Sequence, residues 1–250
     1  MKKLFILLLV ILCTACGTEK QKKIEIGITQ IVEHSSLDDV RRGVIDALKE
    51  KGYDENKVNI DYKNAQGDFG TAQVIAQEFN NKSDIIIAIS TPSAQAAANN
   101  IKDKPIFFSA ITNPESAGIL RKNVTGVSDK SPVKKQVQLI KKLLPEAKNI
   151  GIVYNTSEQN SFYLTDAFTK AAEEEGYTVK IKGINNISEM ASALDTLLPT
   201  IDVLYTSIDN TIASTYPLIV EKCNKANKPI IGATKSFADQ GALAVDGISD

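Results

Sequence analysis

The sequence has no tryptophan, a single histidine, three cysteines and two methionines among its 250 residues. One histidine leaves little for acid–base catalysis or for a metal site of the usual His and Cys ligands, and no nucleophile-elbow motif is present. Lys and Arg (29) nearly balance Asp and Glu (30), so the chain lacks the basic surface expected of a nucleic-acid-binding protein. The absence of tryptophan argues weakly against a sugar ligand. Composition therefore favours neither an enzyme nor a nucleic-acid-binding protein, and no cofactor is expected.

The first fifteen residues have the pattern of a secretory signal. Lys2 and Lys3 precede an unbroken apolar run, Leu4–Leu12, and small residues follow it. That run is too short to cross a bilayer, which takes about 20 residues. We therefore expect residues 1–15 to be a cleaved signal peptide and the mature chain to be extracytoplasmic.

Cys16 follows two small residues in a pattern that resembles a bacterial lipobox, whose cysteine is acylated and becomes the mature N-terminus. Cys13 stands where that pattern usually has Leu, a mild departure. Acyl chains on Cys16 would anchor the protein to the cell membrane, with residues 16–23 as a polar tether. Only Cys223 then remains as a thiol, so no disulfide framework is expected and Cys223 is predicted to be a core residue.

An internal repeat relates the two halves of the chain. Four pairs of segments follow one another in the same order at an offset of 124 residues: Ile26–Ile28 and Ile150–Ile152, Ala47 and Ala171, Gly52-Tyr53 and Gly176-Tyr177, and Lys104–Ile106 and Lys228–Ile230. Such a repeat predicts two copies of one structural unit.

Each unit has the pattern of alternating strands and helices. Strands are predicted at Ile24–Thr29, Val58–Tyr62, Asp84–Ile89, Pro105–Ser109, Asn149–Tyr154, Thr178–Lys182, Val203–Ser207 and Pro229–Ile231. Helices are predicted at Leu37–Lys51, Thr71–Asn80, Pro92–Asn100, Ser131–Leu144, Ser161–Glu175, Ser188–Leu197 and Thr211–Ala226. This alternation predicts an α/β fold of two doubly wound parallel-sheet lobes, residues 24–128 and 129–250, with the chain crossing between them at 124–129.

Several motifs, spread from residue 24 to the last residue, carry a family resemblance. They are Gly27–His34, Ser90–Ala96, Thr112–Pro114, Asn123–Asp129, Tyr154–Ser161 and Asp209–Thr211. The chain is similar to the tryptophan/tyrosine-binding group of ABC importer substrate-binding proteins, which have the type I periplasmic-binding-protein fold. The resemblance implies a monomer that binds an aromatic amino acid, a membrane permease as partner, and no catalysis. Family members continue past residues 241–250 and return to the first lobe, so it also implies that the second lobe is truncated at its C-terminal end.

The repeat places three pairs of strand-end loops opposite each other: Thr29-Gln30 and Tyr154-Asn155, Ser90-Thr91 and Asp209-Asn210, and Ala110–Asn113 and Thr234–Ser236. Ligands of open α/β sheets bind at such strand ends. Ser90–Ser93 joins a buried strand to a helix whose first N–H groups are unpaired, which suits a carboxylate. Asp209 in the other lobe is suited to an ammonium group. Ordinary helix capping is the alternative explanation for both segments.

The predicted contacts with ligand come from both units. They are Gln30, Ser90, Thr91, Ser93, Thr112, Asn113, Tyr154, Asn155, Glu158, Asn160, Ser161, Asp209 and Asn210. The resemblance implies that some of Glu158, Asn160 and Ser161 touch the ligand, although Asn160 and Ser161 are equally plausible caps. His34 is expected to be a surface residue or a neighbour of the helix cap, although the resemblance keeps a ligand contact open as the alternative. The side chain of the ligand needs an apolar wall, and the candidates are the aromatic residues near the second-lobe strand ends: Tyr154, Phe162, Tyr163, Tyr205 and Phe237. Most of these are expected to be core residues.

Fold does not settle the ligand. Nucleosides, other amino acids and small sugars remain alternatives, as does an added role as a surface adhesin or receptor. In each case the architecture predicts that the lobes close around the ligand.

Overall fold

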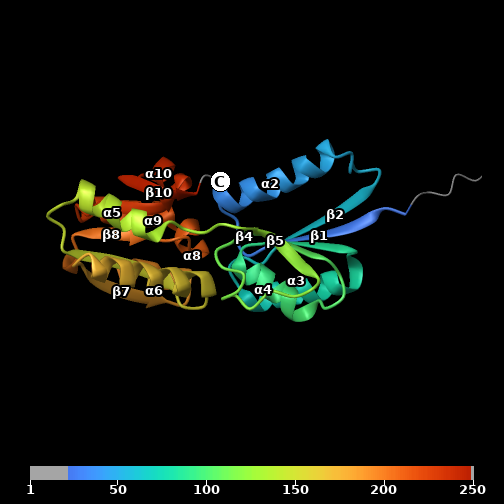
Figure 1. The fold of residues 1–250 in the computed structure, drawn as a ribbon, viewed down its shortest axis with the longest axis horizontal. Helices are drawn as coiled ribbons and strands as arrows, with labels where there is room; N and C mark the ends of the chain where they lie inside the picture. Colours follow the sequence, from blue (N-terminus) through green and yellow to red (C-terminus); the bar gives the residue numbers. More distant parts are fainter. Residues whose placement is uncertain (1–21, 249–250) are drawn as a thin grey trace, which may run out of the picture.

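The structure, a computed structural model, describes residues 22–248 and consists of two lobes placed end to end along the long axis (Figure 1). The predicted signal peptide, Cys16 and all but the last two residues of the predicted tether lie outside the described residues. Each lobe contains one five-stranded parallel sheet. Within residues 22–248, no helix combines the length and the apolar character that crossing a membrane requires.

The first lobe is built from the first eight elements of residues 22–248. Its strands are β1 (Ile24–Gln30), β2 (Val58–Asn64), β3 (Ile85–Ile89), β4 (Ile106–Ile111) and β5 (Val124–Ser128). Its helices are α2 (Ser35–Glu50), α3 (Phe69–Lys82) and α4 (Thr91–Asn100). The strands lie in the order β2-β1-β3-β4-β5.

The second lobe repeats this plan. Its strands are β6 (Asn149–Asn155), β7 (Thr178–Ile184), β8 (Val203–Thr206), β9 (Ile230–Thr234) and β10 (Ala244–Ile248). Its helices are α5 (Val133–Leu143), α6 (Gln159–Glu174), α7 (Met190–Leu197), α8 (Asn210–Ser214), α9 (Tyr216–Lys225) and α10 (Lys235–Gln240), with 3₁₀ turns at Ile187–Glu189 and Leu198–Thr200. The order β7-β6-β8-β9-β10 is that of the first sheet. The duplication predicted from sequence is therefore confirmed.

The paired glycines of the repeat have physical explanations. A Cβ on Gly27 would come within 2.7 Å of the Phe79 ring on α3, and one on Gly151 would collide with Ile201. Both glycines thus let a covering segment approach an interior strand of its sheet, β1 or β6. Gly52 and Gly176 follow the helices α2 and α6 with φ of +78° and +88°, a conformation that favours glycine.

Substituting the first of these glycines should be costly. Gly27→Ala forces the added methyl against Phe79, so we expect it to lower the free energy of unfolding by about 1–3 kcal/mol. The matched control is Gly43→Ala on α2, where a Cβ meets nothing within 4 Å. There alanine should raise stability by up to about 1 kcal/mol, as it does in helix interiors. Urea unfolding of the two variants separates these outcomes, and equal effects would contradict the packing assignment.

Aromatic pairs mark the two faces of the second sheet. Phe168 stacks on Tyr205 with ring centroids 3.6 Å apart, and Tyr216 stacks on Phe237 at 4.1 Å. Tyr205 and Cys223 are fully buried, so the prediction that Cys223 is a core residue is confirmed. The Tyr205 hydroxyl donates to Gln136 of α5 at 2.6 Å, which fastens that helix to the second lobe.

Some element predictions were wrong. The strands β5 and β10 were not predicted, because each is short and lies at the edge of its sheet. The helix predicted at Thr211–Ala226 is two helices, α8 and α9, since Pro217 in the first turn of α9 lacks the N–H that would continue α8. β5 ends at Ser128, and α5 packs against the second lobe. We therefore propose that the boundary between the two lobes lies between residues 128 and 129.

Candidate ligand-binding site

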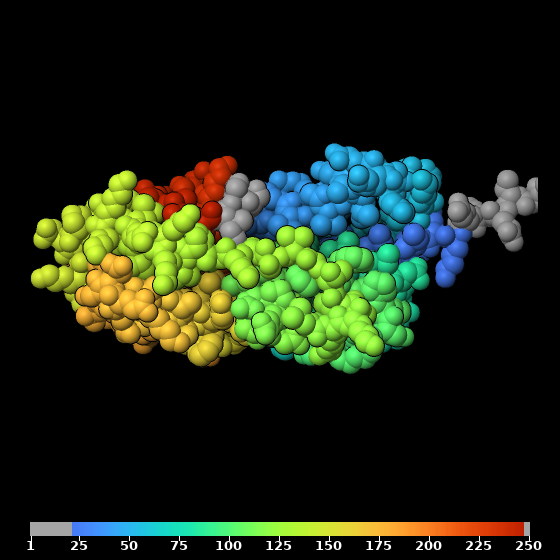
Figure 2. All heavy atoms as spheres, in the orientation of Figure 1, coloured from blue at the N-terminus to red at the C-terminus, as the bar shows by residue number. Residues whose placement is uncertain are grey.

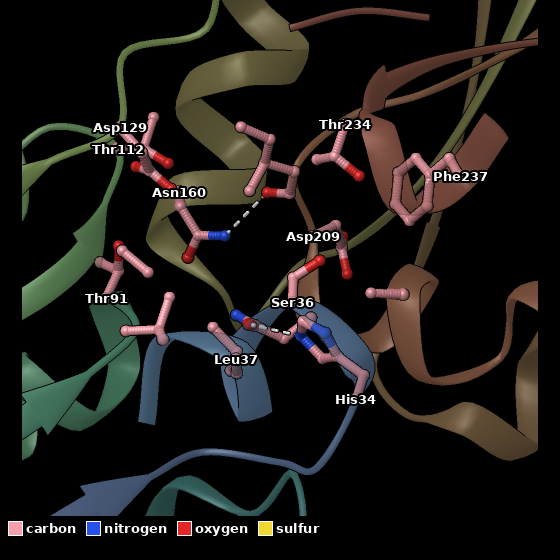
Figure 3. Close-up of a pocket in the computed structure, with 15 residues that line it drawn as sticks. His34, Ser36, Leu37, Thr91, Thr112, Asp129, Asn160, Asp209, Thr234 and Phe237 are labelled. Carbon is pink, nitrogen blue, oxygen red and sulfur yellow. Dashed lines mark hydrogen bonds between the residues drawn. The ribbon is translucent and has the colours of Figure 1, made fainter. Parts of the chain in front are cut away.

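A pocket lies between the two lobes, where the carboxyl ends of the two parallel sheets face each other (Figure 3). It holds about 550 Å³ of space that no atom fills, part of it open to solvent. Its lining comes from both lobes: His34, Ser36, Leu37, Val40, Thr91, Ala110, Thr112, Asp129, Asn160, Ile208, Asp209, Asn210, Ala213, Thr234 and Phe237. A concave site lined from both lobes at the strand ends is where a ligand of such a fold binds.

On the first-lobe side the pocket meets the N-terminus of α4. Thr91 is the first residue of this helix and lines the pocket. The hydroxyls of Ser90 and Ser93 are buried without a hydrogen-bond partner among the described residues. Unpaired N–H groups and the helix dipole favour an anion at such a terminus. This end of the pocket is therefore equipped for a carboxylate.

Two residues on the same side have unusual backbone conformations. Ser90 has φ of +83° and Ala110 has φ of +56°, although neither is glycine. Such conformations cost roughly 1–3 kcal/mol each and cluster at ligand-binding sites. Ser90 directly follows β3, and Ala110 is the next-to-last residue of β4 and lines the pocket. Two of the four non-glycine residues with positive φ in the described part of the chain therefore lie where the first lobe faces the ligand space.

On the second-lobe side, Asp209 both lines the pocket and caps α8. Its carboxylate accepts the Ile212 N–H at 2.9 Å and the Asn155 N–H at 2.7 Å. Burial raises the pKa of Asp209, and these backbone hydrogen bonds act in the opposite direction. Asp209 therefore caps a helix, which was the alternative explanation from the sequence, and it also lines the pocket.

Glu158 lies beneath the second-lobe wall of the pocket and holds Asn210 and Thr211 in place by hydrogen bonds. Its carboxylate accepts hydrogen bonds from the Asn210 N–H and side-chain amide, at 3.1 and 2.5 Å, and from the Thr211 N–H and hydroxyl, at 3.1 and 3.0 Å. The side chain is 5% exposed. Burial raises the pKa of Glu158 to about 7, with the charge of Asp209 adding to the increase. Glu158 therefore fixes the direction in which the Asn210 amide points.

This raised pKa predicts a pH dependence. Between its ordinary value of 4.5 and about 7, native Glu158 retains a proton that the unfolded chain has lost. Its contribution to stability is therefore present at low pH and is lost as pH rises through about 7, by at most about 1.4 kcal/mol per pH unit. Glu158→Gln cannot release the proton, so its unfolding free energy should decline less between pH 5 and 7.5 than that of the wild type. Parallel curves in urea titrations over this range would contradict the assignment.

Direct contacts join the lobes beside the pocket. His34 Nε2 lies 3.4 Å from Asn210 Oδ1, and the hydroxyls of Ser36 and Ser236 are 2.9 Å apart. His34 and Ser36 belong to the first lobe and their partners to the second. The space-filling view shows the two lobes in contact on the face drawn (Figure 2). The structure is therefore that of a closed arrangement.

Apolar side chains line the pocket from both lobes. Phe237 borders it and is held flat against Tyr216, with the two ring planes 5° apart. Leu37 and Val40 of α2 add aliphatic surface from the first lobe. Of the aromatic residues considered from sequence, Phe237 is the one that lines the pocket, whereas Phe162 is 61% exposed on α6.

The structure brings together part of the predicted set. Thr91, Thr112, Asn160, Asp209 and Asn210 line the pocket. Two others support it from behind: Asn155 donates to Thr211 at 2.7 Å, and Glu158 holds Asn210. The buried residues Ser90 and Ser161 directly neighbour lining residues in the chain, and buried Ser93 lies two positions after Thr91.

Three predicted residues have other surroundings. The Gln30 amide donates to Val32 O and to the Asp38 carboxylate, both at 2.9 Å, within the first lobe. The Asn113 side chain accepts backbone N–H groups of the turn that follows it. Tyr154 is partly buried against the second-lobe core. None of these three is among the residues that line the interlobe pocket.

Four polar residues of the lining were not among the predicted contacts: His34, Ser36, Asp129 and Thr234, of which Thr234 alone stood in a predicted strand-end loop. His34 was expected at the surface, but it contacts the other lobe. Asp129 directly follows β5, a strand that was not predicted, so nothing marked it as a strand-end residue. The strand-end rule that selected Thr91 and Asp209 would have found Asp129 once β5 was known.

This arrangement can bind but offers little for chemistry. Among residues 22–248, no group of three or more His, Cys, Asp and Glu side chains is placed to hold a metal. Two lobes with facing strand ends, joined by a crossing segment and closed over one pocket, define the class of two-lobed ligand-binding proteins.

Comparison with known proteins gives the family. The profile of the family described as "ABC transporter substrate binding protein" matches residues 25–250, and the chain belongs to this family. It is the substrate-binding component of an ABC importer and not an enzyme. The chain is 44% identical over 239 residues to the tyrosine-binding protein of Clostridioides difficile (strain R20291), covering 92% of this chain and 69% of that protein.

Two solved structures show which conformation is present. An ABC domain from Streptococcus pneumonia in complex with L-Trp has a TM-score of 0.85 at 36% identity, covering 90% of this chain and 79% of that one. The ligand-free, open structure of a substrate-binding protein with adhesive properties from Clostridium difficile has a TM-score of only 0.59, although its identity is 41% and the coverage is 89% and 79%. The described arrangement therefore resembles the ligand-bound form more than the open one.

Proposed function

We propose that the protein captures an aromatic amino acid, tyrosine or tryptophan, in the interlobe pocket and delivers it to a membrane permease. The observation that carries this proposal is the composition of the pocket. An anion-binding helix terminus and several buried polar groups lie at one end, and a flat aromatic wall lies at the other. The tyrosine-binding relative and the L-Trp complex support the same ligand class.

The ligand carboxylate binds at the N-terminus of α4. Thr91 and Thr112 supply hydroxyls there, and the unpaired hydroxyls of Ser90 and Ser93 lie nearby. From the second lobe, Asn160 adds a polar side chain at this end, whereas Asp209 lies nearer to Phe237 (Figure 3). Hydrogen bonds to a charged group contribute about 1.5–3 kcal/mol each, so this end of the pocket supplies much of the affinity.

The ligand ring packs against Phe237. Its stacking on Tyr216 immobilises the Phe237 ring before ligand arrives, which lowers the entropic cost of binding. Aromatic pairs add about 0.5–1.5 kcal/mol beyond the burial of apolar area. Leu37 and Val40 of the first lobe and Phe237 of the second can contact the same ligand ring only when the lobes are closed, so an aromatic side chain also favours closure.

A ligand screen tests the proposal. In differential scanning fluorimetry with amino acids, nucleosides and sugars, L-tyrosine or L-tryptophan at 100 times its Kd should raise the free energy of unfolding by about 2.7 kcal/mol. Calorimetry on the responding compounds then gives the affinities. Stabilisation by a nucleoside or sugar, with no response to any aromatic amino acid, would contradict the proposed ligand.

We also propose that the protein works outside the cytoplasm as a monomer, anchored by acyl chains on Cys16 after removal of residues 1–15. The pattern of the first sixteen residues supports this proposal. Cys16→Ser should release the protein from the membrane fraction into the medium, while ligand binding stays unchanged. Retention of the variant on the membrane would contradict the anchor.

A second role in surface attachment is favoured by one observation. The open Clostridium difficile structure, at 41% identity, is of a substrate-binding protein with adhesive properties. Deleting the gene should then reduce attachment of the bacterium to a host-cell layer, and a pocket variant that cannot bind ligand should restore attachment but not ligand-dependent growth. Normal attachment of the deletion strain would contradict the adhesive role and would not affect the proposed role in transport.

A further inference from the structure

Asp129 is a second carboxylate that lines the pocket. It directly follows β5 and its N–H donates to Ile111 O at 3.0 Å, so the backbone here continues the edge of the first sheet. From Asp129 the chain crosses to α5 in the second lobe. The Asp129 side chain is therefore held on the segment that connects the lobes.

Asn160 presents a fixed acceptor on the same side of the pocket. Its amide nitrogen donates to Ile208 O at 3.1 Å and lies 3.3 Å from Glu158 Oε2, which leaves Oδ1 as the atom facing the ligand space. Asn160 is only 3% exposed, and its Oδ1 has no hydrogen-bond partner among the described residues. An unsatisfied buried acceptor costs about 1–3 kcal/mol and points to a donor that the ligand supplies.

These groups gather at one end of the pocket. In Figure 3, Asp129, Thr112, Asn160 and Thr91 lie together, whereas Phe237 lies across the pocket from them. A carboxylate and an amide oxygen are both acceptors, and an ammonium group offers three donors with no acceptor. The neighbouring α4 terminus is suited to the opposite charge. An amino acid's two charged groups thus find complementary partners side by side.

The other pocket carboxylate is less suited to the ammonium group. Each oxygen of Asp209 already accepts a backbone N–H, from Ile212 and Asn155. Figure 3 places Asp209 nearer to Phe237 and Thr234 than to Thr91. Asp209 therefore faces the region of the ligand side chain.

Given the proposed amino-acid ligand, on which this step rests, we propose that Asp129 and Asn160 together bind its α-ammonium group. Asp129 comes from the crossing segment and Asn160 from the second lobe. The ammonium group then bridges the hinge region and the second lobe, while the carboxylate is bound by the first lobe at α4. A ligand that lacks either charged group loses one of these attachments and closes the lobes less effectively.

A double comparison tests this assignment. Calorimetry measures L-tyrosine and its deaminated analogue, 3-(4-hydroxyphenyl)propanoate, on the wild type and on Asp129→Asn. The wild type should bind L-tyrosine at least about 30-fold more tightly than the analogue, as expected for a buried charge pair. In Asp129→Asn this ratio should fall below about threefold. Asp129→Ser, which also removes the charge, should reproduce the fall, and Lys130→Gln should keep the wild-type ratio.

The outcomes separate the two proposals. An unchanged ratio in both Asp129 variants, with melting temperatures near that of the wild type, overturns the ammonium assignment while the proposed function stands. Equal binding of the two compounds by the wild type also overturns it. A wild type that binds neither tyrosine nor tryptophan overturns the proposed function itself, and the ammonium assignment with it.

Discussion

Thr91→Asp should reduce the affinity for an aromatic amino acid by at least about 100-fold and leave the fold intact. The new carboxylate stands at the first position of α4, where the ligand carboxylate is proposed to bind. Two like charges about 4 Å apart in a partly buried site repel by up to about 4 kcal/mol. Thr91 is only 2% exposed, so the new charge should also lower the free energy of unfolding, and the about 0.3–1 kcal/mol contributed by the helix N-terminus offsets only part of this cost. Calorimetry and urea unfolding measure the two quantities separately.

Tyramine provides the control for this charge effect. It lacks the carboxylate, so Thr91→Asp should bind it at least as well as the wild type does. Thr91→Val, which removes only the hydroxyl, should cost about tenfold for tyrosine, the value of one ordinary hydrogen bond. If Thr91→Asp binds tyrosine with wild-type affinity, the α4 terminus is not the carboxylate site.

Asn210→Asp should destabilise the protein by about 3–5 kcal/mol at pH 8, the penalty of an uncompensated buried charge. The substitution is nearly isosteric, but it replaces the amide that donates to Glu158 with an oxygen. Three buried carboxylates would then lie together, since Asp209 is adjacent. The penalty should shrink at pH 5, where protonation relieves the repulsion.

The control for this change is an asparagine without such neighbours. Asn224 on α9 is exposed, so Asn224→Asp should stay within about 0.5 kcal/mol of the wild type. Urea unfolding at the two pH values measures both variants. A cost for Asn210→Asp that matches the control, or that does not depend on pH, would show that Glu158 is not ionised at this site.

The contacts between the lobes bear on the mechanism. The His34–Asn210 and Ser36–Ser236 hydrogen bonds are of the kind that contributes about 0.5–1.5 kcal/mol each. A ligand that touches both lobes adds to them and shifts the population toward the closed form, by as much as its affinities for the two forms differ. Glu158 serves this step indirectly, because it holds the Asn210 amide with its oxygen toward His34.

Much of the fold could be predicted because the sequence contains an internal repeat. The recurrence of Ile26–Ile28 as Ile150–Ile152, together with the helix-ending Gly52 and Gly176, predicted two equivalent sheets, and the strand orders confirm them. The edge strands β5 and β10 were missed because short edge strands carry a weak hydrophobic pattern. Missing β5 also meant missing Asp129.

The site could be predicted only as far as strand ends allow. That rule selected Thr91, Thr112 and Asp209, which the structure places at the pocket. The rule could not predict that the Gln30 amide donates a hydrogen bond to Asp38. Nor could it predict that the hydrogen-bond donors to the Glu158 carboxylate are Asn210 and Thr211, about fifty positions later in the chain. Such side-chain partners depend on packing between elements, which no local pattern encodes.

Small-angle X-ray scattering of the purified protein with and without ligand tests the central claim most directly. The claim is that two lobes close over an aromatic amino acid bound between them. With saturating L-tyrosine or L-tryptophan, the radius of gyration should fall and the scattering curve should match the closed arrangement described above. Without ligand it should match an open form. Calorimetrically proven binding that leaves the scattering curve unchanged would contradict the account.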